Sequence, residues 1–123
     1  NDANNLLYDT PEIALTNAGL CVYDNKPQIG EEYFKKALSK NPRFSYALIK
    51  MADISYNRNE YELAYQYFER YQDNARHSPK SLWLGIQICK ELNFEDDVSS
   101  YALLLRNQYP DTVEAKKLSE WQL

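Results

Sequence analysis

The stretch FSYALIKMADISYNRNEYELAYQYFERYQDNA, residues 44–75, contains two helix patterns separated by a polar turn. Its first half has apolar or small residues at i, i+3, i+4 and i+7, the spacing of one face of an α-helix. These residues are Leu48, Met51, Ala52 and Ser55. The second half shows helical spacing again, in Leu63, Ala64, Tyr67, Phe68 and Tyr71. Because residues 57–59 supply a short turn, the stretch predicts two antiparallel helices, over about 44–58 and 60–75.

The same pattern recurs on both sides of this stretch with a period close to 34 residues. Gly30, Phe34 and Ala37 recur 34 residues later as Ala64, Phe68 and Tyr71. A third copy follows 33 residues after the second, with Gly85 in the place of Ala52 and Tyr101 in the place of Phe68. Repeats of this length are typical of stacked supersecondary units, in which each unit packs against its neighbours.

The repeat divides the chain into three helix pairs and a final helix. Residues 1–10 are interpreted as a linker or the tail of a preceding repeat. The three repeats are predicted over 11–42, 43–77 and 78–110, and a capping helix over 111–123. Asp111 or Thr112 is the expected N-cap of that last helix, which offers Val113, Leu118 and Trp121 to cover the third repeat.

Each remaining helix has its own expected packing face. The faces of the first repeat are Ala14, Asn17, Ala18 and Cys21, then Tyr33, Phe34, Ala37 and Leu38. Those of the third repeat are Ser81, Leu84, Gly85 and Ile88, then Val98, Tyr101, Ala102 and Leu105. The small residues Ala18, Ala52, Gly85, Gly30 and Ala64 allow helices to approach to the short end of about 8–10 Å.

Composition argues against several classes of partner. The chain has 123 residues with 14 basic against 18 acidic side chains, and it has no Lys/Arg run that would attract nucleic acid or an anionic membrane. Its longest apolar stretches are too short to span a bilayer, and residues 1–10 lack the basic start and apolar core typical of a signal peptide. Because it begins at Asn1 without a Met, we expect it to be a segment of a longer polypeptide.

The sequence does not predict catalytic or metal chemistry. His77 is the one histidine, so no His pair, metal triad or Ser/His/Asp set is available, and we expect it to be a solvated loop residue. Cys21 and Cys89 lie on first helices two units apart, which is too far for a disulfide, so two free thiols are expected. No cofactor is expected, and the protein is not expected to be an enzyme.

A second stripe on the first helix of each pair lies about 100° from the packing face and predicts a concave wall for a partner protein. The candidate protein-binding residues are Leu15, Val22, Ile49, Asp53, Tyr56, Leu82 and Ile86 on the wall and Tyr23, Tyr46, Lys50 and Trp83 at its margins. The alternative is that several of them, Ile49, Leu82 and Ile86 above all, simply pack between neighbouring units. A clamp for a terminal carboxylate is not expected. Repeat modules that bind chaperones hold such a carboxylate with Lys, Asn and Arg, and this chain has Leu15, Gly19 and Ile49 at those positions.

The pattern of small and aromatic residues resembles the tetratricopeptide repeat. The matching positions are Ala18, Gly30, Phe34, Ala37 and Pro42 in the first unit and Ala52, Ala64, Phe68 and Tyr71 in the second. The resemblance implies an all-α fold, a right-handed superhelix of antiparallel helix hairpins with a C-terminal capping helix. Asp97 departs from the pattern at a small position, where it could loosen the last hairpin or turn its carboxylate to solvent.

A narrower resemblance, to the PilF/PilW family of type IV pilus biogenesis proteins, covers essentially the whole chain. It is carried by LTNAGL (15–20), EYFKKALSKNP (32–42), SLWLGI (81–86) and SYALLLRNQYP (100–110). It implies the C-terminal repeats of an outer-membrane lipoprotein, on the periplasmic face, that acts as a pilotin for the pilus secretin. The lipid anchor would lie outside this segment. A generic repeat adaptor for an unrelated complex, or a regulatory repeat domain attached to an enzyme, are the alternatives.

Overall fold

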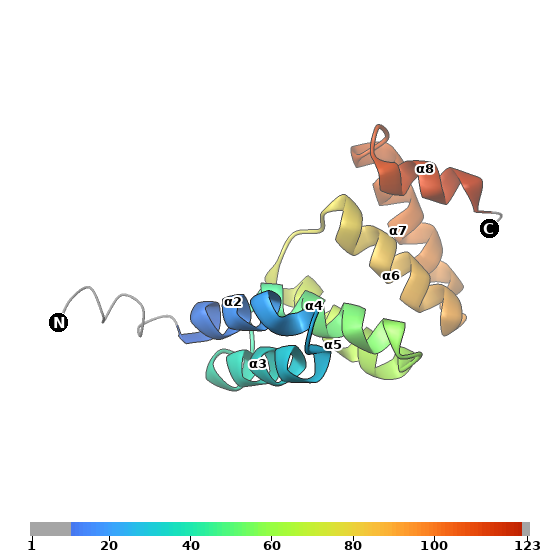
Figure 1. The fold of residues 1–123 in the computed structure, drawn as a ribbon. Helices are drawn as coiled ribbons and strands as arrows, with labels where there is room; N and C mark the ends of the chain where they lie inside the picture. Colours follow the sequence, from blue (N-terminus) through green and yellow to red (C-terminus); the bar gives the residue numbers. More distant parts are fainter. Residues whose placement is uncertain (1–10, 122–123) are drawn as a thin grey trace.

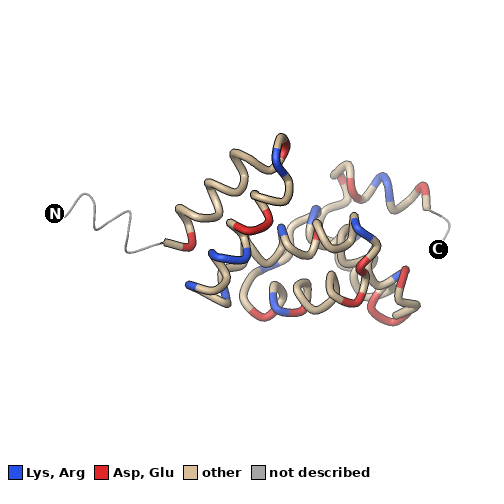
Figure 2. The backbone as a smooth tube through the Cα atoms, turned by 60° about the horizontal axis from the view of Figure 1, so that its bottom comes forward, with Lys and Arg blue, Asp and Glu red and all other residues tan. Residues whose placement is uncertain are grey.

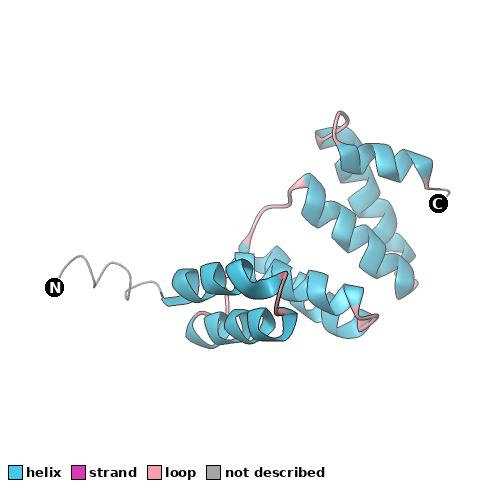
Figure 3. Ribbon diagram, viewed as in Figure 1, coloured by secondary structure: helices cyan, strands magenta, loops and turns pink. Residues whose placement is uncertain are grey.

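A computed structural model describes residues 11–121, and within that range the chain forms seven α-helices and no strand (Figures 1 and 3). The helices are α2 (Pro11–Tyr23), α3 (Pro27–Lys40), α4 (Ser45–Asn57), α5 (Tyr61–Asn74), α6 (Pro79–Glu91), α7 (Glu95–Gln108) and α8 (Val113–Glu120). The predicted tail 1–10 and the last two residues of the predicted capping helix, 122 and 123, lie outside the described residues.

The helices pack as successive hairpins, which confirms the all-α prediction. α2 pairs with α3, α4 with α5 and α6 with α7, and adjoining hairpins meet through α3 with α4 and α5 with α6 (Figure 1). α8 packs on α6 and α7, as expected of a helix that covers the last pair. Each of the ranges 11–42, 43–77 and 78–110 encloses one hairpin.

Local sequence sets the helix ends. Pro27 and Pro79 open α3 and α6, where their missing N–H costs nothing. Thr112, one of the two predicted caps, accepts a hydrogen bond from the Ala115 amide at 3.2 Å. Asn59 and Asn93 follow α4 and α6 with φ of 65° and 62°, a left-handed conformation that asparagine tolerates better than most residues.

Most predicted packing faces are buried. The faces of α4, α6 and α7 lie wholly within the core, in clusters that join adjacent hairpins. On α5 the prediction is wrong for Leu63, which remains 38% exposed, while Ala64, Phe68 and Tyr71 are buried.

The packing face that was predicted for α2 is wrong. Ala14, Asn17 and Cys21 are exposed, and Thr16 and Gly19 are buried instead. On α6 the equivalent face meets the preceding hairpin, with Gly85 against the Phe68 ring. No helix precedes α2 within residues 11–121, so its equivalent face is uncovered there.

Glycine allows the closest contacts between helices. A Cβ built on Gly85 would lie 2.3 Å from Cζ of Phe68, so α6 can approach α5 this closely only with glycine at this position. Within the first hairpin, a Cβ on Gly19 would lie 2.7 Å from Cε1 of Phe34, and one on the predicted Gly30 would lie 2.9 Å from Cα of Tyr23. Glycine therefore meets an aromatic residue between hairpins at Gly85 and within a hairpin at Gly19 and Gly30.

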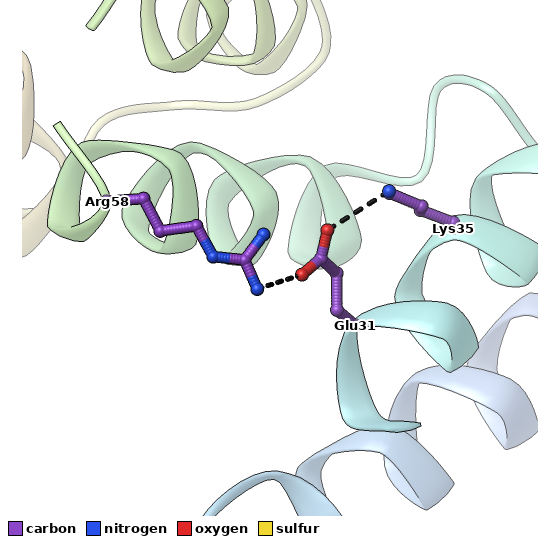
Figure 4. A network of polar contacts seen from close by, with 3 residues as sticks. All are labelled: Glu31, Lys35 and Arg58. Atoms are coloured by element: carbon purple, nitrogen blue, oxygen red, sulfur yellow. Dashed lines mark ion pairs between the residues drawn. The ribbon is translucent and has the colours of Figure 1, made fainter. Parts of the chain in front are cut away.

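A buried carboxylate joins the first two hairpins. Glu31 on α3 forms ion pairs with Lys35, one turn along the same helix at 3.0 Å, and with Arg58, which follows α4 (Figure 4). Burial alone would raise the pKa of Glu31, but hydrogen bonds from Arg58 and Lys35 outweigh it and lower that pKa below its ordinary value. The pairing compensates the cost of burying this charge.

His77 lies between the second and third hairpins, and the expectation of a solvated loop residue is wrong. Its ring stacks on Phe68 with centroids 5.4 Å apart and meets Tyr101 edge-on at 5.8 Å. Its Nε2 lies 2.9 Å from Oε1 of Gln72 on α5, and its Nδ1 lies 2.8 Å from the Ser81 hydroxyl on α6. The imidazole therefore connects two hairpins.

The position of His77 predicts a pH-dependent stability. Desolvation by burial lowers the pKa of His77, so the folded protein holds the ring neutral at pH values where the unfolded chain, with a pKa of about 6.5, takes up a proton. The stabilisation is thus complete above about pH 6.5 and is lost as pH falls through the lowered folded pKa. We expect the free energy of unfolding, measured with urea, to decrease between about pH 7.5 and about pH 5.5.

His77→Gln is the control for this pH dependence. Gln keeps a hydrogen-bonding side chain but does not titrate, and the chain has no second histidine. The variant should be less stable at neutral pH but should show a flatter pH profile. A profile as steep as that of the unmodified protein would show that another group is responsible.

Candidate functional site

A hollow of about 380 Å³ opens between α4 and α6. Its walls come from both helices, from the end of α5 and from the segment that leads into α6. The lining residues are Tyr46, Ile49, Lys50, Asp53, Tyr71, Ser78, Lys80, Ser81 and Leu84. Four of these belong to the predicted wall, namely Tyr46, Ile49, Lys50 and Asp53. The α4–α6 hollow therefore contains most of the part of that wall that lies on α4.

The α4–α6 hollow combines an apolar floor with charged edges. Tyr71 and Leu84 are almost fully buried members of the core, and Ile49 packs against them from α4. Tyr46 is 47% exposed, and the Lys50 ammonium lies 5.7 Å from the centre of its ring. A rigid apolar floor beside an accessible aromatic ring is the arrangement found at the centre of protein interfaces.

Asp53 lies at the edge of the same hollow. Its side chain reaches solvent, yet desolvation by the surrounding walls raises its pKa, and Lys50 offsets only part of that rise. A carboxylate that is incompletely hydrated favours a hydrogen-bond donor from a bound molecule.

Leu82 and Ile86 were predicted on the accessible wall, and that prediction is wrong. Both side chains are fully buried in the core that α6 forms with α5, α7 and α8, so they are not accessible to a partner. Their apolar character reflects packing between units, which was the alternative interpretation. Ile49 is partly buried between the two core clusters and is shared between packing and the hollow.

Tyr56 and Trp83 lie away from the α4–α6 hollow. Tyr56 packs beside Tyr61, with ring centroids 5.6 Å apart, and Trp83 packs on Trp121 with centroids 4.8 Å apart. Lys90 places its ammonium 5.6 Å from the Trp121 ring. These aromatic side chains are partly buried at the core's edge, where they hold the turn after α4 and the end of α8.

The three candidates on α2 form no part of the hollow. Leu15 and Tyr23 pack on the core cluster that contains Phe34, and the Tyr23 ring centroid lies 6.2 Å from that of Phe34. Val22 is half-buried next to Tyr23. Whether these side chains contact a partner stays a prediction.

Sequence reasoning missed the contribution of α6 to the hollow. Lys80 and Leu84 line it, as does Ser78 just before the helix. The signal was present, because Lys80 stands in the first turn of a helix that was predicted to share one concave wall with α4. Helical spacing identifies the residues on one face of a single helix. It therefore did not identify Lys80, which lines a hollow between two helices.

A second cluster lies where the α6–α7 turn meets α5. The Tyr65 hydroxyl lies 3.4 Å from Asp97 Oδ2, and Tyr65 packs edge-on against Phe94. Asp97, which stands where the repeat pattern has a small residue, thus faces the preceding hairpin.

The buried Cys89 thiol is unreactive. Its desolvation, together with the nearby charges of Asp97 and Glu69, raises its pKa to about 12.

Both cysteines are free thiols, with Cys21 exposed and Cys89 buried. Within residues 11–121 no three His, Cys, Asp or Glu side chains are grouped so that they could hold a metal ion. None of the helices described is long and apolar enough to cross a membrane.

Comparison with known proteins identifies similar chains. The chain is 33% identical over 109 residues to the type IV pilus assembly protein PilF of Pseudomonas aeruginosa, covering 88% of this chain and 43% of PilF. A solved structure of Pseudomonas aeruginosa PilF matches with a TM-score of 0.87 at 31% identity, over 94% of this chain and 52% of that one. No protein-family model matches the sequence.

A structure of PilW, described as a widely conserved type IV pilus biogenesis factor, also matches. The TM-score is 0.76 at 26% identity, over 94% of this chain and 54% of PilW. The chain therefore spans about half the length of the relatives that it resembles.

Proposed function

The chain is a tetratricopeptide-repeat protein homologous to PilF and similar in structure to PilW, and we propose that it is a non-enzymatic scaffold of type IV pilus biogenesis. In this role it acts as a pilotin, which assists the outer-membrane localisation and assembly of the pilus secretin. Similarity to PilF along 88% of the chain is the observation that carries the proposal.

The fold supports a binding role. Three hairpins and α8 form an open stack, and such stacks present extended surfaces to other proteins. The α4–α6 hollow offers an accessible Tyr46, an apolar floor and charged edges on that stack. Nothing in this surface requires a cofactor. The proposed location is the periplasmic face of the outer membrane, reached through a lipid anchor outside this segment.

A direct binding experiment tests the proposal. The full-length protein that contains this chain is mixed with the purified secretin of the same organism, and binding is measured by biolayer interferometry. We expect saturable binding, and we expect deletion of the gene to reduce secretin multimers in outer-membrane fractions. If the full-length protein does not bind the secretin, the pilotin role is wrong.

A further inference from the structure

The α4–α6 hollow has an uneven charge. Two lysines, Lys50 on α4 and Lys80 in the first turn of α6, stand at its edges against a single carboxylate, Asp53. None of the three forms an ion pair with another residue of the range 11–121. Lys50 lies over the Tyr46 ring and interacts with the charge of Asp53. The hollow nevertheless has two lysines against one carboxylate, so its local excess is positive on a chain whose net charge is −4.

The size of the hollow limits what enters it. Its space of about 380 Å³ lies between residues of α4 and α6 that line it together with Tyr71. A bound protein can therefore place only a few side chains of a short segment in it.

We propose that the α4–α6 hollow binds a short segment of a partner protein in which an acidic residue stands next to an apolar residue. The acidic side chain pairs with Lys50 and Lys80. The apolar side chain rests on Ile49 and Leu84, beside the Tyr46 ring. This proposal rests on the proposed function as a protein-binding scaffold and adds the chemistry of the segment that is bound.

Asp53 gives the hollow selectivity among acidic segments. A second carboxylate placed near Asp53, which also lines the hollow, would be repelled by its charge. A single acid beside an apolar residue therefore fits better than a run of acids. This distinguishes the hollow from a surface that attracts any polyanion.

The test uses the full 123-residue chain and three fluorescein-labelled synthetic peptides. The peptides share a flexible Gly/Ser frame and one Leu, and they carry Glu, Gln or Lys next to that Leu. Fluorescence anisotropy should show the Glu peptide binding at least about tenfold more tightly than the Gln peptide, with the difference reduced by salt. The Lys peptide should bind most weakly.

Charge reversal in the protein completes the test. Lys50→Glu with Lys80→Glu should weaken the Glu peptide by about tenfold or more and strengthen the Lys peptide. Lys116→Glu with Lys117→Glu, on the exposed face of α8, changes the net charge equally and should leave both affinities unchanged. Circular dichroism confirms that both double variants are folded.

Each outcome decides the inference. Equal binding of the Glu and Gln peptides, no binding of any peptide, or an equal loss in the α8 control would overturn it. Charge-dependent peptide binding by a protein that ignores the secretin would keep the hollow's chemistry and remove the pilotin role. Secretin binding unchanged by Lys50→Glu with Lys80→Glu would place the secretin contact elsewhere.

Discussion

Phe68→Ala is expected to lower the free energy of unfolding by about 3–5 kcal/mol, the usual cost of removing a buried aromatic ring. Phe68 is fully buried on α5, and its ring contacts the next hairpin as well as its own. It packs against Tyr71, His77 and Tyr101, with ring centroids 6.5, 5.4 and 5.7 Å away. Alanine would leave a cavity at the junction between the second and third hairpins.

Urea unfolding followed by two signals locates the effect. Both tryptophans, Trp83 and Trp121, belong to α6 and the end of α8, so their fluorescence reports the C-terminal part, whereas circular dichroism reports all helices. Since repeat stacks are held by neighbour contacts, we expect the tryptophan transition of Phe68→Ala to move to lower urea than in the unmodified protein. Leu63→Ala, at a 38% exposed site on the same helix, should cost less than about 1 kcal/mol. Equal losses in the two variants would contradict the role assigned to Phe68.

The repeat period predicted the helix hairpins because the same residue spacing is written three times. The packing face of α4 was predicted correctly, because α4 has a hairpin on each side of it. Leu48 and Met51 on that face are therefore buried. The same rule failed on α2, where exposure of Cys21 depends on what packs outside the hairpin. Periodicity describes one helix and its turn, so it cannot say which of two apolar faces is covered.

The candidate site was predicted in part for the same reason. Tyr46 and Lys50 were predicted at the margins of the wall stripe of α4, and Lys80 was missed because it lines the hollow from α6. Leu82 and Ile86 occupy the equivalent stripe of α6 but are fully buried in the core. His77 was assigned to solvent from its polar neighbours in sequence, although its neighbours in space are Phe68 and Tyr101.

Gly85→Ala tests whether close approach of α5 and α6 holds the second and third hairpins together. In an open helix this substitution would stabilise the protein by about 1 kcal/mol, because alanine has the higher helix propensity. Here the new methyl would overlap the Phe68 ring, which is itself enclosed by Tyr101 and His77 and cannot turn away. We expect the overlap to prevail, with a net loss of about 1–3 kcal/mol in urea unfolding.

A double-mutant cycle with Phe68→Leu separates this steric effect from any other consequence of the substitution. Leucine is shorter than phenylalanine and lacks the Cζ atom that lies 2.3 Å from the ideal Cβ position at residue 85. In the Phe68→Leu background, Gly85→Ala should therefore cost much less than in the unmodified protein, or even stabilise it. A coupling energy of about 1 kcal/mol or more between the two sites is expected, because the side chains are in direct contact. If Gly85→Ala costs the same in both backgrounds, the methyl does not meet the Phe68 ring, and the glycine is required for a different reason.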